Sequence, residues 1–471
     1  MTPWMLRRCS SEAKLALLAM CNASWERAEI PEAWRLATIV PLLKTGKTPA
    51  EIGSYRPVSL TSCLCKTAER LVQRRLQHWS EANGIFDPAQ AGFRANRSTE
   101  EQVARVAQFA MDGFNARPRM ERTLVVLVDF SRAYDRVWKR GLLFKMRKNG
   151  VPGCIQRWVA NFFADRRARV QWGDTFSRTK VLKEGLPQGC VLSPLLWLLY
   201  MDDVKDALAV VPETLGSKYA DDLALVIRGN HREELAERMQ LALNALEEWC
   251  EQWSVKISVE KTVALLLSTD PADNNGKYDP HLSINGKAIQ VEKEPVFLGV
   301  TLDSQLGFGA HAKKVQANIA RRTNLLRRLK GKKWGCRPKL LLHAHSAYIQ
   351  PVARYGASSW AVMASKSVVD NVQASLNVGL RVATGCSSDT NRQVLLAEAG
   401  AIPLDIQAKA AAALLYEKAL RLPSDVPIHQ VALQTVERRI RYGGGGKKAA
   451  VRQGPPDPPA VAPAPSMPPM P

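Results

Sequence analysis

The residues best suited to chemistry are two adjacent carboxylates, Asp221 and Asp222, in the run Tyr-Ala-Asp-Asp at 219–222. The apolar run 223–227 follows them, which predicts a buried strand leaving a tight turn. Asp is favoured in turns for backbone reasons alone, so this pair by itself does not establish a site. A third carboxylate, Asp129, ends another apolar run at 124–129. Two strands that carry Asp at their ends offer hard oxygen ligands to divalent cations, a pattern that fits a two-metal phosphoryl-transfer centre.

The charge of the chain indicates a polyanionic partner. Its 471 residues hold 66 Lys plus Arg against 44 Asp plus Glu, a net charge of +22. This excess favours nucleic acid over a membrane, and no apolar run approaches the length of a membrane span. The segment 311–340 alone carries eleven Lys or Arg and no acid. The nine cysteines lack zinc-ligand or disulfide spacing, so we expect an intracellular protein, acting in the nucleus after cytoplasmic synthesis.

Periodicity and turn residues predict the elements that position these groups. We expect a helix in 1–30, a strand at 37–43 leading to Lys44, an extended segment at 54–61 and a helix N-cap at Ser98. Further strands are predicted at 124–129, 255–259, 263–267 and 296–300, and helices at 141–165, 192–204 and 232–253. A helix from 311 carries an apolar stripe of Val315, Ile319, Leu326 and Leu329. Gly and Pro dominate 443–471, which predicts a disordered tail.

Several of these segments together resemble the ordered motifs of reverse transcriptases. They are Asp129 with Tyr134, the Leu-Pro-Gln-Gly run at 186–189, the run 219–222, Glu-Lys-Thr at 260–262 and Phe-Leu-Gly-Val at 297–300. The upstream stretches 54–61 and 90–99 resemble those of non-LTR (LINE-type) retrotransposons of the jockey and ingi type. The resemblance covers residues 20–340 and implies a fragment of a larger polyprotein.

The resemblance implies an α+β right-hand polymerase, with fingers, a palm carrying an antiparallel sheet, and a helical thumb. We expect a helical extension at 1–30, fingers and palm at 31–303, a thumb at 304–345, a further helical region at 346–442 and the disordered tail. The implied activity is RNA-directed DNA synthesis that extends a DNA 3′ end on an RNA template, as in target-primed reverse transcription. The implied partners are the RNA template, a DNA primer or target and dNTPs.

The resemblance also assigns roles to individual residues. Asp129, Asp221 and Asp222 would hold two Mg²⁺ ions, with Mn²⁺ as an alternative, and Asp129 and Asp221 are the surer ligands. Lys261 would give a proton to the leaving pyrophosphate. The remaining assignments are nucleotide contacts at Tyr134, Gln188, Arg56 and Lys44, a primer grip at Phe297, Leu298 and Gly299, and phosphate contacts at Arg321, Arg322, Arg327 and Arg328.

Each assignment has an alternative that the sequence leaves open. A Tyr near the start of a helix is commonly a packing residue, loop lysines are commonly solvated, and the arginines could solubilise a helix or face another domain. At the level of the whole chain, the alternatives are a non-catalytic RNA-binding relic of a truncated element and a group II intron maturase-like or telomerase-like protein. The oligomeric state, the target site and the template are not determined.

Overall fold

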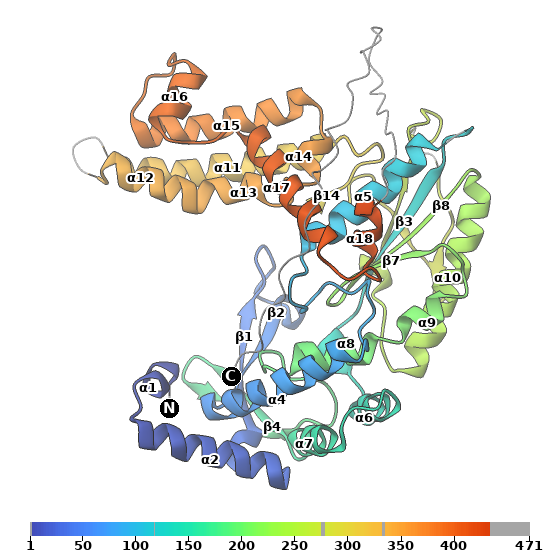
Figure 1. Cartoon of the computed structure of the whole chain (residues 1–471), viewed down its shortest axis with the longest axis vertical. Coiled ribbons are helices and arrows are strands. Elements are labelled where there is room, and N and C mark those ends of the chain that lie inside the picture. The colour runs from blue at the N-terminus through green and yellow to red at the C-terminus, as the bar shows by residue number, and fades with distance from the viewer. Residues whose placement is uncertain (1, 117, 275–277, 332–334, 434–471) are drawn as a thin grey trace, which may run out of the picture. The chain divides into compact units, whose positions relative to one another are not determined.

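The apolar runs that carry the carboxylates form neighbouring strands of one five-stranded sheet, ordered β12-β9-β3-β8-β7. Its central strand, β3 (Arg122–Asp129), pairs antiparallel with β8 (Asp222–Gly229) and with β9 (Val263–Leu267). The outer strands are β7 (Leu215–Tyr219) and β12 (Gln290–Val291). The computed structural model describes residues 2–116, 118–274, 278–331 and 335–433, and Figure 1 shows their arrangement.

Both faces of this palm sheet are covered, because alternate residues of a strand point to opposite sides. Leu124 and Val126 lie in one hydrophobic core, together with residues of α8 (Ser193–Met201) and α10 (Arg232–Gln252). Val125 lies in a second core with α5 (Thr99–Asn115) and the helices that follow the sheet in sequence. A one-residue slip of β3 would exchange these two sets of side chains, so the two cores fix the register that places Asp129 at the strand end.

A second sheet forms the expected fingers, ordered β2-β1-β4-β5 with β6 paired to β4. Its strands are β1 (Leu36–Leu43), β2 (Tyr55–Leu60), β4 (Arg167–Trp172), β5 (Thr175–Phe176) and β6 (Lys180–Val181). The helices of this half of the chain are α1 (Pro3–Arg7), α2 (Ser11–Arg27), α3 (Glu32–Arg35), α4 (Cys63–Ala82), α6 (Lys139–Lys148), α7 (Gly153–Phe163) and α9 (Val204–Leu208).

After the palm the chain is helical, and the expected boundary at 345 falls inside a helical run. This run is α12 (Pro338–Ala344), a π-helical turn (His345–Ile349) and α13 (Gln350–Arg354). The thumb helix α11 (Gly309–Lys330) packs along α15 (Lys366–Thr384), so residues beyond 345 belong to the same bundle. The other helices are α14 (Trp360–Met363), α16 (Arg392–Glu398), α17 (Leu404–Leu420) and α18 (Pro427–Leu433), and α18 contacts α5.

Three local expectations are corrected. The segment 255–259 forms no ladder strand, because Lys256 O accepts from Ser131 N–H and Ser258 N–H donates to Asp129 O as the segment crosses the end of β3. The segment 296–300 is a hairpin of two short strands rather than one strand. Leu329 is 46% exposed, because it lies on the last turn of α11 beyond the buried positions. The predicted disordered tail at 443–471 lies outside the described residues.

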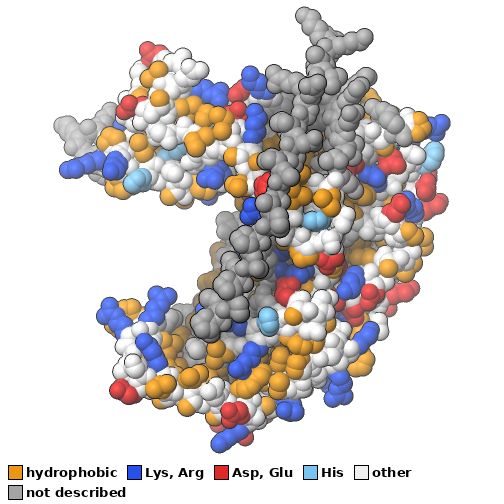
Figure 2. All heavy atoms as spheres, in the orientation of Figure 1, with side chains coloured by type: hydrophobic (Ala, Val, Ile, Leu, Met, Phe, Trp, Pro, Cys, Tyr) orange, Lys and Arg blue, Asp and Glu red, His pale blue; other side chains and the backbone are white. Residues whose placement is uncertain are grey.

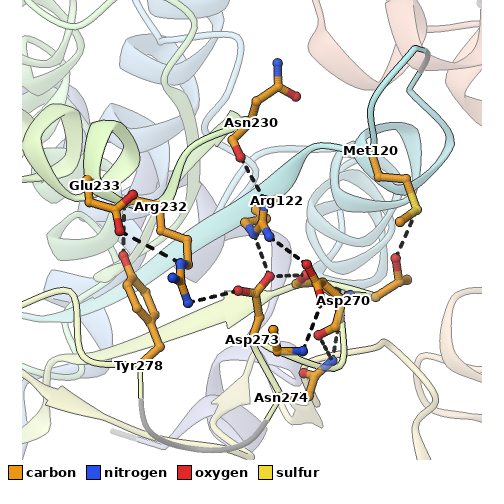
Figure 3. A network of polar contacts seen from close by, with 12 residues as sticks. Met120, Arg122, Asn230, Arg232, Glu233, Asp270, Asp273, Asn274 and Tyr278 are labelled. Carbon is orange, nitrogen blue, oxygen red and sulfur yellow. Dashed lines mark hydrogen bonds and ion pairs between the residues drawn. The ribbon is translucent and has the colours of Figure 1, made fainter.

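The end of β3 opposite Asp129 is held by a charged network (Figure 3). Arg122 pairs with Asp273 at 2.5 Å and with Asp270 at 2.8 Å, and it donates to Asn230 O at 2.8 Å. Arg232, the first residue of α10, pairs with the other oxygen of Asp273 at 3.3 Å. The Asp273 side chain is 1% exposed, so the network ties β3, α10 and the loop after β9 together away from solvent.

Candidate active site

The three predicted carboxylates meet at one edge of the palm sheet. Asp129 and Asp222 are directly opposite each other in the β3–β8 register. Directly opposed residues of an antiparallel pair have Cα atoms about 4.5–5.5 Å apart. Tyr219 pairs with Asp222, so Ala220 and Asp221 are the two central residues of a β7–β8 hairpin turn. Ala220 has φ +60°, which a residue with a side chain adopts at a cost and which is typical of functional turns.

The carboxylates raise one another's pKa. Burial raises the pKa of Asp222 to about 6, and the charges of Asp221 and Asp129 add to this rise. Burial also raises the pKa of Asp221, with a further rise from Asp129 and a smaller opposing effect of the Arg56 charge. Both side chains are reachable by solvent, so the surrounding protein rather than full enclosure causes the desolvation. Close carboxylates of this kind make a strongly negative site that attracts a cation.

Lys261 lies where the sequence predicted. Its Nζ is 3.2 Å from Asp129 Oδ2, and both side chains are exposed enough for either to turn toward a ligand. The strand end itself is fixed, since Asp129 N–H donates to Thr262 Oγ1 at 3.3 Å and Asp129 O accepts from Ser258 N–H at 2.8 Å. The Glu-Lys-Thr motif therefore both anchors Asp129 and supplies a cation beside it.

The donor set fits divalent cations, although the carboxylates do not form a closed site. Within the described ranges, no three His, Cys, Asp or Glu side chains converge tightly enough to hold a metal ion by themselves. Three carboxylates at one sheet edge, open to solvent and mutually repelling, are the chemistry that hard cations such as Mg²⁺ select, and Mg²⁺ commonly takes its remaining ligands from water and substrate phosphates.

Two residues that sequence reasoning missed hold the catalytic turn from both sides. Gln90 Oε1 accepts from Ala220 N–H at 3.1 Å and from Gly92 N–H at 2.8 Å. Trp197 Nε1 donates to Ala220 O at 3.0 Å. A Cβ on Gly92 would lie 2.2 Å from Ala220 N, so only glycine allows this approach. The one signal in the sequence was the Gln-Ala-Gly run at 90–92, which read only as a loop.

Tyr134 and Gln188 lie in the loops that flank the carboxylates. The Tyr134 ring stacks on Trp197 with centroids 5.5 Å apart, and burial followed by the charge of Asp221 raises its pKa. Gln188 Nε2 donates to Asp135 Oδ1 at 3.1 Å, and Gln188 O accepts from Ser59 N–H at 2.7 Å. The Leu-Pro-Gln-Gly loop thus connects the segment after Asp129 to the fingers strand β2.

The two remaining nucleotide candidates differ in position. Arg56 on β2 is exposed and close enough to Asp221 to lower its pKa, which places the guanidinium toward the carboxylates. Lys44 follows the last residue of β1, where its Nζ donates to Gly53 O at 2.9 Å. No contact or charge effect links Lys44 to the carboxylates among the described residues, so its assignment stays a prediction.

The primer-grip residues form a turn and the thumb arginines separate into groups. Val296–Phe297 and Val300–Thr301 pair as β13 and β14, so Leu298 and Gly299 are the turn, and the Phe297 side chain is buried. Arg321 and Arg328 lie on α11 seven residues apart, in line with Lys314, which spaces the three cations by roughly 10 Å. By contrast Arg322 donates to Tyr348 O and covers its ring, and Arg327 donates to Asn324 Oδ1 at 2.6 Å.

The surface charge follows the same division. Figure 2 shows Lys and Arg side chains gathered at the α12 end of the thumb helices, whereas acidic side chains gather over α10. Among the described helices, none has both the length and the apolar character needed to cross a bilayer.

The family follows from the match of residues 43–302, more than half of the chain, to the family model described as reverse transcriptase (RNA-dependent DNA polymerase). The chain belongs to the reverse transcriptase family. The expected α+β right-hand class is confirmed with it, and the matched span contains every carboxylate of the site.

Curated relatives confirm the resemblance to non-LTR elements. The chain is 31% identical to the probable RNA-directed DNA polymerase from transposon BS of Drosophila melanogaster, over 81% of this chain and 42% of the relative. It is 30% identical to the RNA-directed DNA polymerase from mobile element jockey of the same species, over 78% of this chain and 40% of the relative. This reverse transcriptase chain therefore spans about two fifths of the length of these relatives. A solved structure of apo telomerase from Candida tropicalis aligns with 90% of this chain and 72% of its own, at a TM-score of 0.44 and 13% identity.

Proposed function

We propose that this chain is the RNA-directed DNA polymerase of a non-LTR retrotransposon, which extends a DNA 3′ end on an RNA template. The observation that carries the proposal is the β3–β8 register, which sets Asp129 opposite Asp222 with Asp221 on the adjoining turn. The same geometry could serve a maturase-like or telomerase-like enzyme. The similarity to the jockey and BS polymerases, together with the upstream stretches 54–61 and 90–99, favours the retrotransposon.

The carboxylates would bind two Mg²⁺ ions, with Mn²⁺ as an alternative, through Asp129, Asp221 and Asp222. Bound there, the ions would lower the pKa of the primer 3′-hydroxyl and stabilise charge on the leaving pyrophosphate. The 3′-oxygen attacks the α-phosphorus of the dNTP, one P–O bond forms and the P–O bond to pyrophosphate breaks.

The side chains around the carboxylates supply the other steps. Lys261, which already lies beside Asp129, donates a proton to the pyrophosphate oxygen. The Tyr134 ring, held flat on Trp197, occupies the space that a ribose 2′-hydroxyl would need. Arg56 contacts the triphosphate, and Gln188 contacts the nascent base pair. Lys44 is the least supported of these contacts.

Primer extension on an RNA template tests the function directly. Asp221→Asn should abolish DNA synthesis in Mg²⁺ and leave RNA binding near wild type, because the change removes one charge and no basic residue. Asp279→Asn, at an exposed loop carboxylate, is the matched control and should extend primers normally. Wild-type protein that binds RNA without any synthesis would support the rival function, a non-catalytic RNA-binding relic. Synthesis by Asp221→Asn at the wild-type rate would refute the carboxylate assignment.

The partners follow from the same proposal. The RNA template, the DNA primer and the dNTPs would meet at the edge of the palm sheet, with the duplex leaving along the thumb. We also propose that the protein acts in the nucleus, where chromosomal DNA supplies the 3′ end. Detection of the expressed chain only in the cytoplasm would contradict that location.

A further inference from the structure

The turn assigned to the primer grip is unfavourable on its own. Leu298 has φ +45° and Gly299 has φ +83°, so both central residues of the β13–β14 turn lie in the left-handed region. Gly tolerates such angles, but Leu does not, and a two-stranded hairpin this short has few hydrogen bonds of its own. The conformation therefore depends on neighbouring parts of the protein.

Those neighbours come from the segment that follows the thumb. The Tyr355 hydroxyl donates to Leu298 O at 2.7 Å and lies 3.1 Å from Thr99 Oγ1 at the start of α5. The Tyr355 ring also lies against the turn, because a Cβ on Gly299 would be 3.0 Å from its Cε1. Tyr355 thus fixes the turn by a hydrogen bond to its carbonyl and by contact with its glycine.

The next residues lock this segment to α5. Glu100 Oε1 accepts from Gly356 N–H at 3.1 Å, and Glu100 Oε2 accepts from Ser358 Oγ at 3.2 Å. Gly356 also packs closely on β14, since a Cβ there would lie 2.9 Å from Val300 Cγ2. A carboxylate in the first turn of a helix is favourable as well, because it faces the positive end of the helix dipole.

The strand on the other side of the turn is held by the thumb. His311, in the first turn of α11, accepts from Thr301 N–H at 3.2 Å through Nδ1. Its ring packs edge-on against Trp360, which is fully buried and donates to Tyr355 O at 3.1 Å. The turn therefore lies between α11 and the segment 355–360, at one wall of a groove of about 430 Å³ that Lys314 and Arg322 also line.

We propose that Tyr355, supported by Glu100, is a positioning residue that sets the primer-gripping turn 298–299, so the helical region after the thumb takes part in placing the primer 3′ end. This inference rests on the proposed polymerase function and extends it to residues outside the expected thumb. Tyr355 touches neither the reacting atoms nor the carboxylates in the structure; it acts through the backbone of Leu298 and Gly299.

The test compares Tyr355→Phe with Tyr348→Phe in the full chain. Tyr355→Phe keeps the ring and removes the hydroxyl that holds Leu298 O, whereas Tyr348→Phe removes a hydroxyl from the same helical run. We expect Tyr355→Phe to lower kcat/KM for primer–template by roughly three- to tenfold, which is what the loss of one hydrogen bond produces, with the KM for dNTP unchanged. Amide exchange at 298–301 should accelerate in Tyr355→Phe alone, at an unchanged melting temperature. Thr99→Val, which leaves the bond to Leu298 O, should resemble wild type.

A second measurement does not need catalysis. A primer with 2-aminopurine at its 3′ end, annealed to RNA and bound to the Asp221→Asn protein, reports the order of the primer end by fluorescence. Tyr355→Phe should increase the mobility of that base, and Tyr348→Phe should not. An unchanged fluorescence signal, or unchanged exchange at 298–301, would overturn the positioning role even if synthesis fell. Absence of synthesis by wild type with the fluorescence change intact would refute the proposed function and keep the contact between Tyr355 and the primer-gripping turn.

Discussion

Replacing Gln90 by leucine removes the acceptor that two backbone N–H groups share while nearly preserving side-chain volume. Gln90 is 5% exposed, so water cannot readily take its place beside Ala220 N and Gly92 N. A buried donor left without an acceptor costs about 1–3 kcal/mol, and the two together should lower the free energy of unfolding by about 2–4 kcal/mol.

Part of that energy should appear in catalysis. Ala220 is held at φ +60° by Gln90 on its N–H and by Trp197 on its carbonyl, and it immediately precedes Asp221. If half of the lost energy is spent in reorienting the turn, about 1–2 kcal/mol, the rate of chemistry falls about 5- to 30-fold at 1.36 kcal/mol per factor of ten. Trp197→Phe keeps a ring under Tyr134 and removes one donor, so its effect should be the smaller of the two.

Single-turnover primer extension at saturating duplex and dNTP measures this rate, and urea denaturation measures the stability. Gln108→Leu is the control, since it removes a half-buried amide that bonds Asp112 on α5, one helical turn along. Should Gln90→Leu keep both the wild-type denaturation midpoint and the wild-type rate, the turn would not depend on Gln90. Lost stability with an unchanged rate would show that the bracket is structural and that Asp221 is set by the β7–β8 pairing alone.

Three further predictions follow from the geometry. Tyr134→Val should raise incorporation of rNTP relative to dNTP, and unchanged discrimination measured by competitive incorporation would leave Tyr134 as a packing residue on Trp197. Arg321→Gln with Arg328→Gln should reduce the slope of log affinity against log salt for an RNA–DNA duplex by roughly 0.9 per contact, whereas Arg327→Gln, on another side of α11, should change it less; equal slopes would remove the thumb assignment. Arg122→Met should lower unfolding free energy by about 2–4 kcal/mol, because Asp273 stays buried with a weaker partner, while Arg392→Met at an exposed pair should cost under about 1 kcal/mol; similar urea midpoints for the two would contradict this.

The carboxylates and the strands that present them could be predicted from the sequence because their information is local. The apolar run 124–129 is β-branched and bounded by polar residues, and it forms β3 (Arg122–Asp129) as expected. The N-cap at Ser98 is also observed, with its side chain accepting from Glu101 N–H. Side-chain type, period and capping chemistry act over a few residues, so one sequence is enough to predict them.

The partners of the two functional turns were decided by tertiary structure. Gln90 reaches Ala220 across 130 positions of sequence, and Glu100 reaches Ser358 across 258. The requirement for glycine at 92 and 299 arises from a neighbouring turn or ring that only folding brings close. The division of the thumb arginines likewise depends on which sides of α11 pack, since Arg322 meets Tyr348 while Arg321 and Arg328 stay exposed. Such contacts depend on the register of the strands and the packing of the helices, which no local pattern in the chain specifies.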